Sequence, residues 1–332
     1  MTTRILRTVG ARFLLPLCSI LIVLVSPTSA FAAATKPIDI RIVTSSGKTV
    51  GDFRQYSGKV HVHATHKAKC FGPDNPSSDQ NYTVSGTTVL GSLADAASSV
   101  HERLLLNNAF ADDGFGLGVC GIGSRVTPYV AYPDTGPYWY SAVSGIATTT
   151  GPDLIPLGAH DEALWYFASG KESGFPSELL LRAPAKASSG DPFKVTVLRV
   201  SPGNGKSKPA KGVQVGGATT NANGHAKLTA NASGTLTLVA KGSKNDIPSA
   251  VQNVCVDSCA GMPPEQIYGS AHKDRIEGTR NADRIKSKSG DDVVDISSGG
   301  ADVVVCGGGH DKVVGKSSND TLRASCERAV SG

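Results

Sequence analysis

The chain has 332 residues, of which only 18% are charged, and it contains 38 glycines. This length predicts two or three domains, and the abundance of Gly, Thr, Ser and Val favours β structure and turns over helices. Without the three arginines of residues 1–32, a segment that has no Asp or Glu, the formal net charge falls from +5 to +2. Such a balanced charge argues against a nucleic-acid partner.

Residues 1–32 have the order of a secretory signal peptide. A basic start (Arg4, Arg7 and Arg12) precedes an apolar stretch over residues 13–25, and small residues lead to an A-x-A site that ends at Ala32. The apolar stretch is shorter than the ~20 residues that a spanning helix needs, and no later segment is apolar enough to cross a bilayer. We therefore expect a secreted protein, extracellular or at the cell surface, with no membrane span after cleavage. An uncleaved anchor is the alternative.

Residues 37–172 alternate as strands around one helix. Strands are predicted at 38–43 and 59–63, and Ser92 with Asp95 resembles a capping box that opens a helix. Leu93, Ala96, Val100 and Leu104 would then lie on one helical face. Further strands are predicted around residues 116–120, 138–140 and 163–167. Strands, one helix and then strands is the order of an α+β, β-grasp-like domain.

Three short pieces of this segment carry a resemblance to a known family. TTVLGSLADAA, GPYWYSAVSG and LIPLGAHDEALWYFASG resemble DUF4430, a domain of unknown function related to the C-terminal domain of transcobalamin. The resemblance implies a module that binds a ligand or a polymer and carries out no reaction.

Aromatic residues give this domain a candidate ligand site. A binding face for a flat or sugar-like ligand would consist of Tyr138, Trp139, Tyr140 and Trp165. The alternative is that these side chains pack half in the core. A metal cluster is a second candidate, formed by His61, His63, His66 and Cys70. Period two places His61 and His63 on one strand face, but Cys70 is better used in a disulfide and no carboxylate is close in sequence.

Residues 178–256 have the pattern of a small β-sandwich. Strands are predicted at 194–200, 213–215 and 235–240, with a hairpin centred on Asn223-Gly224. The pattern GVQVGGATTNANGHAKLT…GTLTLVAKG resembles the immunoglobulin-like spacer domains of bacterial surface proteins. That resemblance implies a module that presents its neighbours and carries no chemistry.

Residues 264–332 contain a nine-residue repeat. Aspartates recur in steps of nine, nine, ten, nine and nine residues, at Asp274, Asp283, Asp292, Asp302, Asp311 and Asp320. A branched aliphatic residue stands two positions after each, at Ile276, Ile285, Val294, Val304, Val313 and Leu322. With small turn-forming residues before each Asp, the pattern resembles the G-G-x-G-x-D-x-U-x nonapeptide of RTX, or haemolysin-type, calcium-binding proteins.

The repeat predicts a parallel β-roll with calcium as its ligand. Each nonapeptide would form a turn and a three-residue strand, so that two repeats make one coil and turns on one side lie about eighteen residues apart. The aliphatic residues would point inward. Calcium between stacked turns would take oxygen from all six aspartates and from backbone carbonyls. Glycine is needed where carbonyls converge, because a Cβ would hinder that conformation.

Some turns depart from the repeat. The fourth position of the turn is His272, Asn281 and Ser318 in the first, second and last turns, where Gly is expected. Residues 261–332 hold ten Lys or Arg against eleven Asp or Glu, and few surplus carboxylates should weaken ion binding. We expect occupied sites between the turns that carry Asp292, Asp302, Asp311 and Asp320. An ion-free solenoid that keeps the aliphatic ladder is the alternative.

Six cysteines lie beyond the signal peptide: Cys70, Cys120, Cys255, Cys259, Cys306 and Cys326. Six cysteines allow fifteen pairings, and grouping by sequence favours 70–120, 255–259 and 306–326. An oxidising compartment suits these disulfides, whereas a metal site at Cys255-x-x-x-Cys259 would lack a second pair of ligands.

Nothing in the sequence matches a catalytic motif such as H-E-x-x-H or G-x-S-x-G. We expect a mainly β, multidomain, non-catalytic calcium-binding protein that recognises an extracellular ligand of unknown identity: a glycan, a small molecule or a cell-surface component. The alternatives are an extracellular hydrolase with scattered catalytic residues and a purely structural cell-envelope protein.

Overall fold

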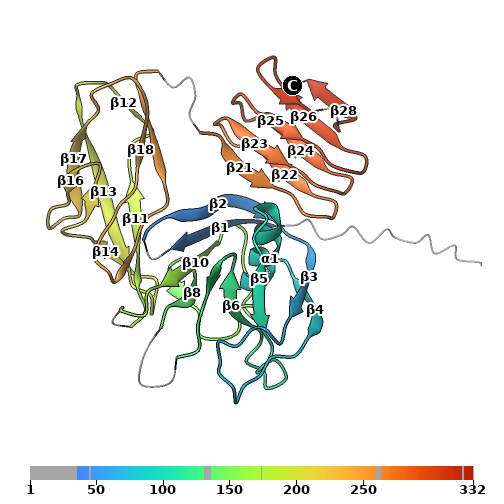
Figure 1. Cartoon of the computed structure of the whole chain (residues 1–332). Helices are drawn as coiled ribbons and strands as arrows, with labels where there is room; N and C mark the ends of the chain where they lie inside the picture. Colours follow the sequence, from blue (N-terminus) through green and yellow to red (C-terminus); the bar gives the residue numbers. More distant parts are fainter. Residues whose placement is uncertain are drawn as a thin grey trace, which may run out of the picture. The chain divides into compact units, whose positions relative to one another are not determined.

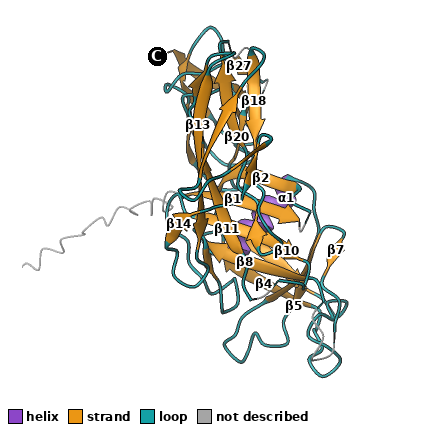
Figure 2. Ribbon diagram, turned by 90° about the vertical axis from the view of Figure 1, so that its left-hand side faces the viewer, coloured by secondary structure: helices purple, strands orange, loops and turns teal. Residues whose placement is uncertain are grey.

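The computed structural model describes residues 36–331 except 45, 131–135, 173, 259–262 and 324. The predicted signal peptide and Cys259 lie outside the described residues. Within the described part, the chain is mainly β, with one α-helix and several open sheets (Figures 1 and 2). No helix in this part is both long and apolar enough to cross a membrane.

The N-terminal domain is built on a sheet with the strand order β2-β1-β10-β8-β9. The two central strands, β1 and β10, run parallel, and their outer neighbours run antiparallel to them. This is the order of a β-grasp sheet, in which the last strand lies beside the first. The strands are β1 (Pro37–Thr44), β2 (Thr49–Tyr56), β8 (Tyr138–Val143), β9 (Ile146–Ala147) and β10 (Glu162–Ala168).

Helix α1 (Val89–Ser99) begins earlier than the sequence predicts. Its N-cap is Thr88, whose hydroxyl accepts a hydrogen bond from the Gly91 N–H at 3.1 Å, while Ser92 lies inside the helix. The predicted capping box is therefore wrong, because Thr88 provides the cap one turn earlier. Leu104 is also misplaced in the prediction, since it begins a strand beyond the helix.

A second sheet packs with α1 around the same core, with the order β4-β3-β5-β6-β7. Its strands are β3 (Lys59–Ala64), β4 (Gln80–Ser85), β5 (Leu104–Asn107), β6 (Gly118–Ile122) and β7 (Arg125–Val126). Buried side chains from both sheets, including Ile40 and Leu106, meet those of the helix. The sequence indicated several of these strands but not their separation into two sheets.

Two sheets enclose the core of the predicted sandwich. The first contains β11 (Ser177–Arg182), β13 (Pro192–Val200), β14 (Ser207–Pro209), β17 (His225–Thr229) and β19 (Asp246–Ile247). The second contains β12 (Lys186–Ala187), β18 (Gly234–Leu238) and β20 (Gln252–Val256). The likeness to immunoglobulin-like spacers stays a prediction.

The predicted hairpin across Asn223-Gly224 is wrong. A short ribbon pairs β15 (Gln214–Val215) with β16 (Ala218–Thr219), while β17 pairs with β13. The hairpin turn is Gly216-Gly217, where both residues have positive φ, a conformation that glycine adopts without strain.

The C-terminal repeats form two parallel sheets, the expected β-roll. One sheet contains β21 (Glu265–Tyr268), β23 (Asp283–Lys286), β25 (Val303–Val305) and β27 (Thr321–Leu322). The other contains β22 (Arg275–Glu277), β24 (Val293–Asp295), β26 (Lys312–Lys316) and β28 (Arg328–Ser331). Ile276 pairs with Val294, and Ile285 with Val304, which confirms the predicted coil length. These aliphatic side chains are fully buried in one narrow core.

The first coil of the roll continues the N-terminal sheet. Strand β21 pairs in parallel with β2, so that Ile267 lies opposite Arg54 and one nine-stranded sheet results. Tyr56 of β2 packs in the aliphatic core of the roll, and Lys288 forms an ion pair with Asp95 of α1 at 2.6 Å. Strand β2 therefore covers the first coil, which would otherwise expose its core and its backbone.

Candidate calcium sites and ligand pocket

The six aspartates of the repeats form two rows, because successive turns alternate between the two sides of the roll. The first row is Asp274, Asp292 and Asp311, and the second is Asp283, Asp302 and Asp320. All six side chains are buried, with 8% exposure or less. Six buried carboxylates in so thin a structure require partners for their oxygens.

In four of the six carboxylates, one oxygen joins neighbouring coils. Oδ1 of Asp292 accepts a hydrogen bond from the N–H of Asp274 at 2.8 Å, and Oδ1 of Asp311 accepts from the N–H of Asp292 at 3.0 Å. The second row repeats the arrangement: Oδ1 of Asp302 accepts from the N–H of Asp283 at 2.9 Å, and Oδ1 of Asp320 accepts from the N–H of Asp302 at 2.9 Å. The Asp positions therefore have a structural role that does not depend on an ion.

Glu327 ends the first row, and the sequence prediction did not include it. Its Oε2 accepts a hydrogen bond from the N–H of Asp311 at 2.7 Å, in the place of the next aspartate. Glu327 follows Asp311 by sixteen residues, outside the regular step, so the spacing alone could not identify it.

The second carboxylate oxygen divides the aspartates into two classes. In Asp274, Asp283 and Asp320, Oδ2 accepts a backbone N–H of the same turn, from Ser270, Thr279 and Ser317 at 2.6, 2.6 and 2.7 Å. In Asp292, Asp302 and Asp311, Oδ2 is buried and has no hydrogen-bond partner. The Ser287 hydroxyl is also buried without a hydrogen bond, although it lies close enough to Asp292 to influence the pKa of that carboxyl.

The shifted pKa values follow this division except at Asp283, where burial raises the pKa although Thr279 donates to both carboxylate oxygens. Burial raises the pKa of Asp292 to about 6, and burial raises that of Asp302 to about 6 as well. Burial also acts to raise the pKa of Asp320, but hydrogen bonds from Asp302 and Ser317 outweigh it and the pKa is lowered. Without a cation, the charged forms of Asp292 and Asp302 are therefore disfavoured.

Glycines stand beside the carboxylates that have an unpartnered oxygen. Gly290, Gly300 and Gly309 each precede one of these aspartates by two residues and have φ of 134, 116 and 120°. A Cβ on them would lie 2.5, 2.3 and 2.2 Å from the carbonyl oxygens of His272, Asn281 and Gly290, one coil earlier. Only glycine fits there, because the turn must approach those carbonyls closely.

The unpartnered carboxylate oxygens and the carbonyls beside the glycine turns are of the kind that a hard cation prefers. No group of three or more His, Cys, Asp or Glu side chains that could hold a metal occurs among the residues that the structure describes. An ion in the roll would therefore combine one carboxylate oxygen with backbone carbonyls, which are ligands that calcium accepts.

Two of the predicted disulfides are present. Cys70 is bonded to Cys120, and Cys306 to Cys326. The second closes the last coils of the roll, at the end away from β2. The predicted pair 255–259 includes Cys259, which lies outside the described residues.

The four predicted ligand-binding aromatics all line one cavity of about 320 Å³ in the N-terminal domain. They do not form one face, because alternation along the strands puts Trp139 and Trp165 on the α1 side of the sheet and Tyr138 and Tyr140 on the other. Trp165 is only 2% exposed and belongs to the core, whereas Trp139 is half-buried. The lining includes Tyr138 to Ser141 of β8, whose successive side chains alternate between the two faces of the sheet.

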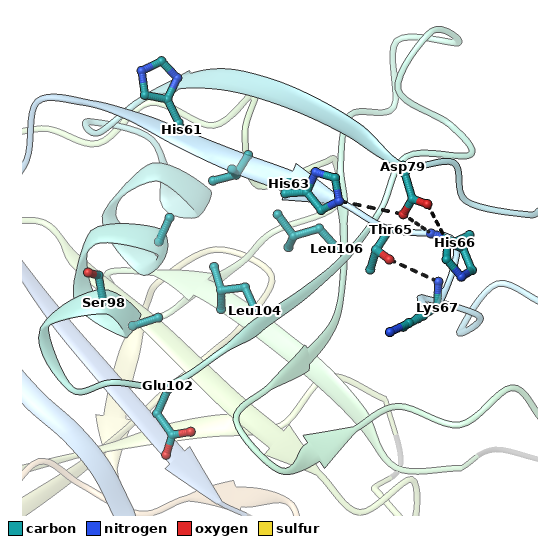
Figure 3. A pocket seen from close by; sticks show the side chains of 13 residues that line it. His61, His63, Thr65, His66, Lys67, Asp79, Ser98, Glu102, Leu104 and Leu106 are labelled. Carbon is teal, nitrogen blue, oxygen red and sulfur yellow. Dashed lines mark hydrogen bonds and ion pairs between the residues drawn. The ribbon is translucent and has the colours of Figure 1, made fainter.

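The histidines line a larger groove of about 740 Å³ between α1 and the second sheet. His63 and His66 flank Asp79, with His66 Nδ1 at 2.6 Å from its Oδ2, while His61 points elsewhere (Figure 3). The alternative of a metal cluster with Cys70 is wrong, because Cys70 is in a disulfide.

Comparison with known proteins identifies the C-terminal repeats. The family model for the RTX calcium-binding nonapeptide repeat matches residues 268–300 and 296–322. No curated protein and no solved structure is significantly similar to the chain. The resemblance of the N-terminal domain to DUF4430 is not among the matches. The C-terminal segment is thus a set of calcium-binding nonapeptide repeats, and the unpartnered oxygens beside the glycine turns fit such an ion.

Proposed function

We propose that this chain is a secreted, non-catalytic calcium-binding protein whose roll is ordered by calcium and whose N-terminal domain recognises an extracellular ligand. The calcium-binding carboxylates are those of Asp292, Asp302 and Asp311. Asp274, Asp283 and Asp320 instead hold the turns together through hydrogen bonds.

The assignment of Asp292, Asp302 and Asp311 to calcium rests on two features that occur together. The three aspartates whose Oδ2 has no partner are the same three that follow a glycine turn placed against a carbonyl of the previous coil. A buried, unpaired carboxylate is costly, and a cation is the partner that removes the cost. The other three aspartates have backbone donors on Oδ2 and gain little from an ion.

Calcium would stabilise the roll by binding only its folded form. At a free concentration of a hundred times Kd, each site adds about 2.7 kcal/mol to the free energy of unfolding. The roll needs such a contribution, because each coil buries only two or three aliphatic side chains, each worth about 1.5–3 kcal/mol.

The test replaces one carboxylate oxygen and keeps the other. In Asp302→Asn, the remaining oxygen can still accept the Asp283 N–H, but the charge is lost. Calcium raises the unfolding temperature of the roll, and we expect this rise to be smaller in Asp302→Asn than in the unaltered protein. We expect the same result for Asp292→Asn and Asp311→Asn. Asp295→Asn is the matched control, since Asp295 is outside the register and its carboxylate accepts from Ser297. Equal responses in all four variants would refute the assignment.

Export is supported by the basic, apolar and small-residue order of residues 1–32 and by the disulfides. We expect the secreted chain to begin at or near Ala33. N-terminal sequencing of secreted material that returns Met1 would contradict this.

Ligand recognition is supported by the aromatic cavity of the N-terminal domain. Retention of the protein on whole cells and on immobilised polysaccharides should be saturable. A structural envelope protein would show no saturable retention, and an extracellular hydrolase would release soluble products from the polysaccharide.

A further inference from the structure

The N-terminal domain and the first coil of the roll each place a tyrosine in the core of the other. Tyr56 of β2 is 3% exposed and packs in the aliphatic core of the roll. Tyr268 of β21 is 9% exposed and belongs to the core of the N-terminal domain. There its ring lies edge-on to that of Phe53, with the ring centroids 4.9 Å apart. Each core is therefore completed by a side chain from the other.

Buried hydrogen bonds connect the same two parts of the chain. Gln55 is fully buried, and its Nε2 donates to the carbonyl of Gly269 in the roll at 2.9 Å and to Oδ2 of Asp95 in α1 at 3.2 Å. The hydroxyl of Tyr56 accepts a hydrogen bond from the N–H of Glu277 in β22 at 3.1 Å. Separating the first coil from β2 would break these bonds and expose both cores to water, which is costly.

The turn that leads to Asp292 is joined to helix α1. Lys288 of this turn has φ 73°, in the left-handed region that residues other than glycine rarely adopt. Its Nζ lies 2.6 Å from Oδ1 of Asp95 in α1, and its carbonyl accepts a hydrogen bond from the N–H of Gly308, one coil later, at 2.9 Å. A turn next to a proposed calcium ligand thus contacts the N-terminal domain directly.

We infer that calcium bound in the roll stabilises the N-terminal domain, because the two parts complete each other's cores and unfold in one cooperative step. This rests on the proposed binding of calcium by the roll and adds its consequence for a domain that holds none of the calcium ligands. An ion that binds only the folded roll favours every part of the chain that must be folded with it. The roll is then a calcium-dependent support for the N-terminal domain and not a separate module.

The two tryptophans of the chain provide the measurement, because Trp139 and Trp165 both pack in the core of the N-terminal domain. The full-length secreted protein is heated in excess calcium and, separately, in a chelator, while tryptophan emission is followed. We expect the midpoint of the emission change to be higher in calcium by about 3 °C or more.

A calorimetric titration of the same protein with calcium separates the two ways in which this can fail. If calcium binds but the tryptophan midpoint is the same with calcium and with chelator, the coupling is refuted and calcium binding stands. If no calcium binds up to millimolar concentration, the coupling and the proposed calcium binding are both refuted.

Lys288→Met tests the contact with α1. It keeps the length of the side chain and removes the charge that pairs with Asp95. We expect the calcium-induced rise in the tryptophan midpoint to be smaller than in the unaltered protein, with the same number of calcium ions bound. Lys312→Met is the matched control, because Lys312 is exposed and lies on β26, which pairs with β24 and β28 of the roll. Its rise should equal that of the unaltered protein.

Tyr56→Phe decides the question if Lys288→Met fails to fold, as judged by circular dichroism. It keeps the ring in the core of the roll and removes the hydroxyl that accepts from Glu277. The calcium-induced rise in the midpoint should again be smaller. In the control Tyr82→Phe, the lost hydroxyl bonds only to Gln80 and Asn108 of the N-terminal domain, so stability changes equally with calcium and with chelator. Equal rises in Tyr56→Phe and Tyr82→Phe would refute the coupling through the shared cores.

Discussion

At the scale of single residues, the repeats of the roll place their six aspartates at regular positions, but the hydrogen bonds of the carboxylate oxygens differ from one repeat to another. The nine-residue spacing predicts all six aspartates and their burial, because the register fixes where each side chain points. It does not predict which carboxylate oxygen has a donor. Ser270 and Ser298 each stand four residues before an aspartate, yet only Ser270 donates to it. The longer step before Asp302 changes the turn, which the sequence alone does not describe.

The glycine turns give the first prediction at this scale. Gly300→Ala should lower the free energy of unfolding of the roll by about 2 kcal/mol or more, because a Cβ at φ 116° is strained and meets the Asn281 carbonyl. It should also weaken calcium binding at Asp302. Denaturant unfolding with and without calcium measures both effects.

Gly308→Ala is the matched control for this change. Nothing lies within 4 Å of a Cβ at Gly308, and its φ is not positive. The variant should stay within about 0.5 kcal/mol of the unaltered protein. If Gly300→Ala and Gly308→Ala lose equal free energy of unfolding, the close approach of the turns is not the reason for glycine at position 300.

At the scale of elements, local patterns predicted strands and the helix better than they predicted pairing. The helix cap and the sandwich hairpin were both misplaced by a few residues, because Thr88 and Gly216-Gly217 compete with the predicted Ser92 and Asn223-Gly224. The attachment of β21 to β2 has no local signal at all, since it joins segments more than two hundred residues apart. The roll is thus closed by β2 at one end and by a disulfide at the other.

The disulfide at the open end gives the second prediction. Cys306 and Cys326 are 20 residues apart, and a bridge over a loop of this size contributes about 3 kcal/mol. Cys326→Ser should therefore speed amide hydrogen exchange in β25 to β28 when calcium is chelated. Exchange in the sandwich should not change. If the amides of the last coils are equally protected from exchange in Cys326→Ser and in the unaltered protein, the roll does not depend on the bridge.

At the scale of the whole molecule, a buried charge cluster joins the N-terminal domain to the sandwich. Arg41 of β1 is 1% exposed and contacts Glu162 of β10 at 2.5 Å, Glu178 of β11, and the carbonyl of Pro248. One arginine thus holds two carboxylates. Burial raises the pKa of Glu178, Glu162 raises it further, and Arg41 only partly opposes them.

A pH dependence of stability follows from Glu178. A carboxyl whose pKa is raised by folding contributes stability below its ordinary pKa of 4.5, and that contribution is lost as the pH rises through the raised value. Between about pH 5 and 8, the unfolding temperature of the unaltered protein should therefore fall more steeply than that of Glu178→Gln. A tenfold change in proton affinity is worth about 1.4 kcal/mol, or roughly 3 °C.

Glu277→Gln is the control for this pH profile, because Glu277 is exposed and lies outside the cluster. Its profile should match that of the unaltered protein. A Glu178→Gln profile parallel to both would show that Glu178 has an ordinary pKa in the folded chain.

The central claim is that three carboxylates of the roll hold calcium and the other three do not. It is tested most directly by counting ions on the full-length secreted protein, because the roll begins on a strand of the N-terminal domain and an isolated fragment would lack that strand. Calorimetric titration of the chelator-treated protein should give three calcium ions per chain, one for each unpartnered Oδ2, and two in Asp302→Asn. No binding up to millimolar calcium, or the same count in Asp302→Asn, would contradict the account.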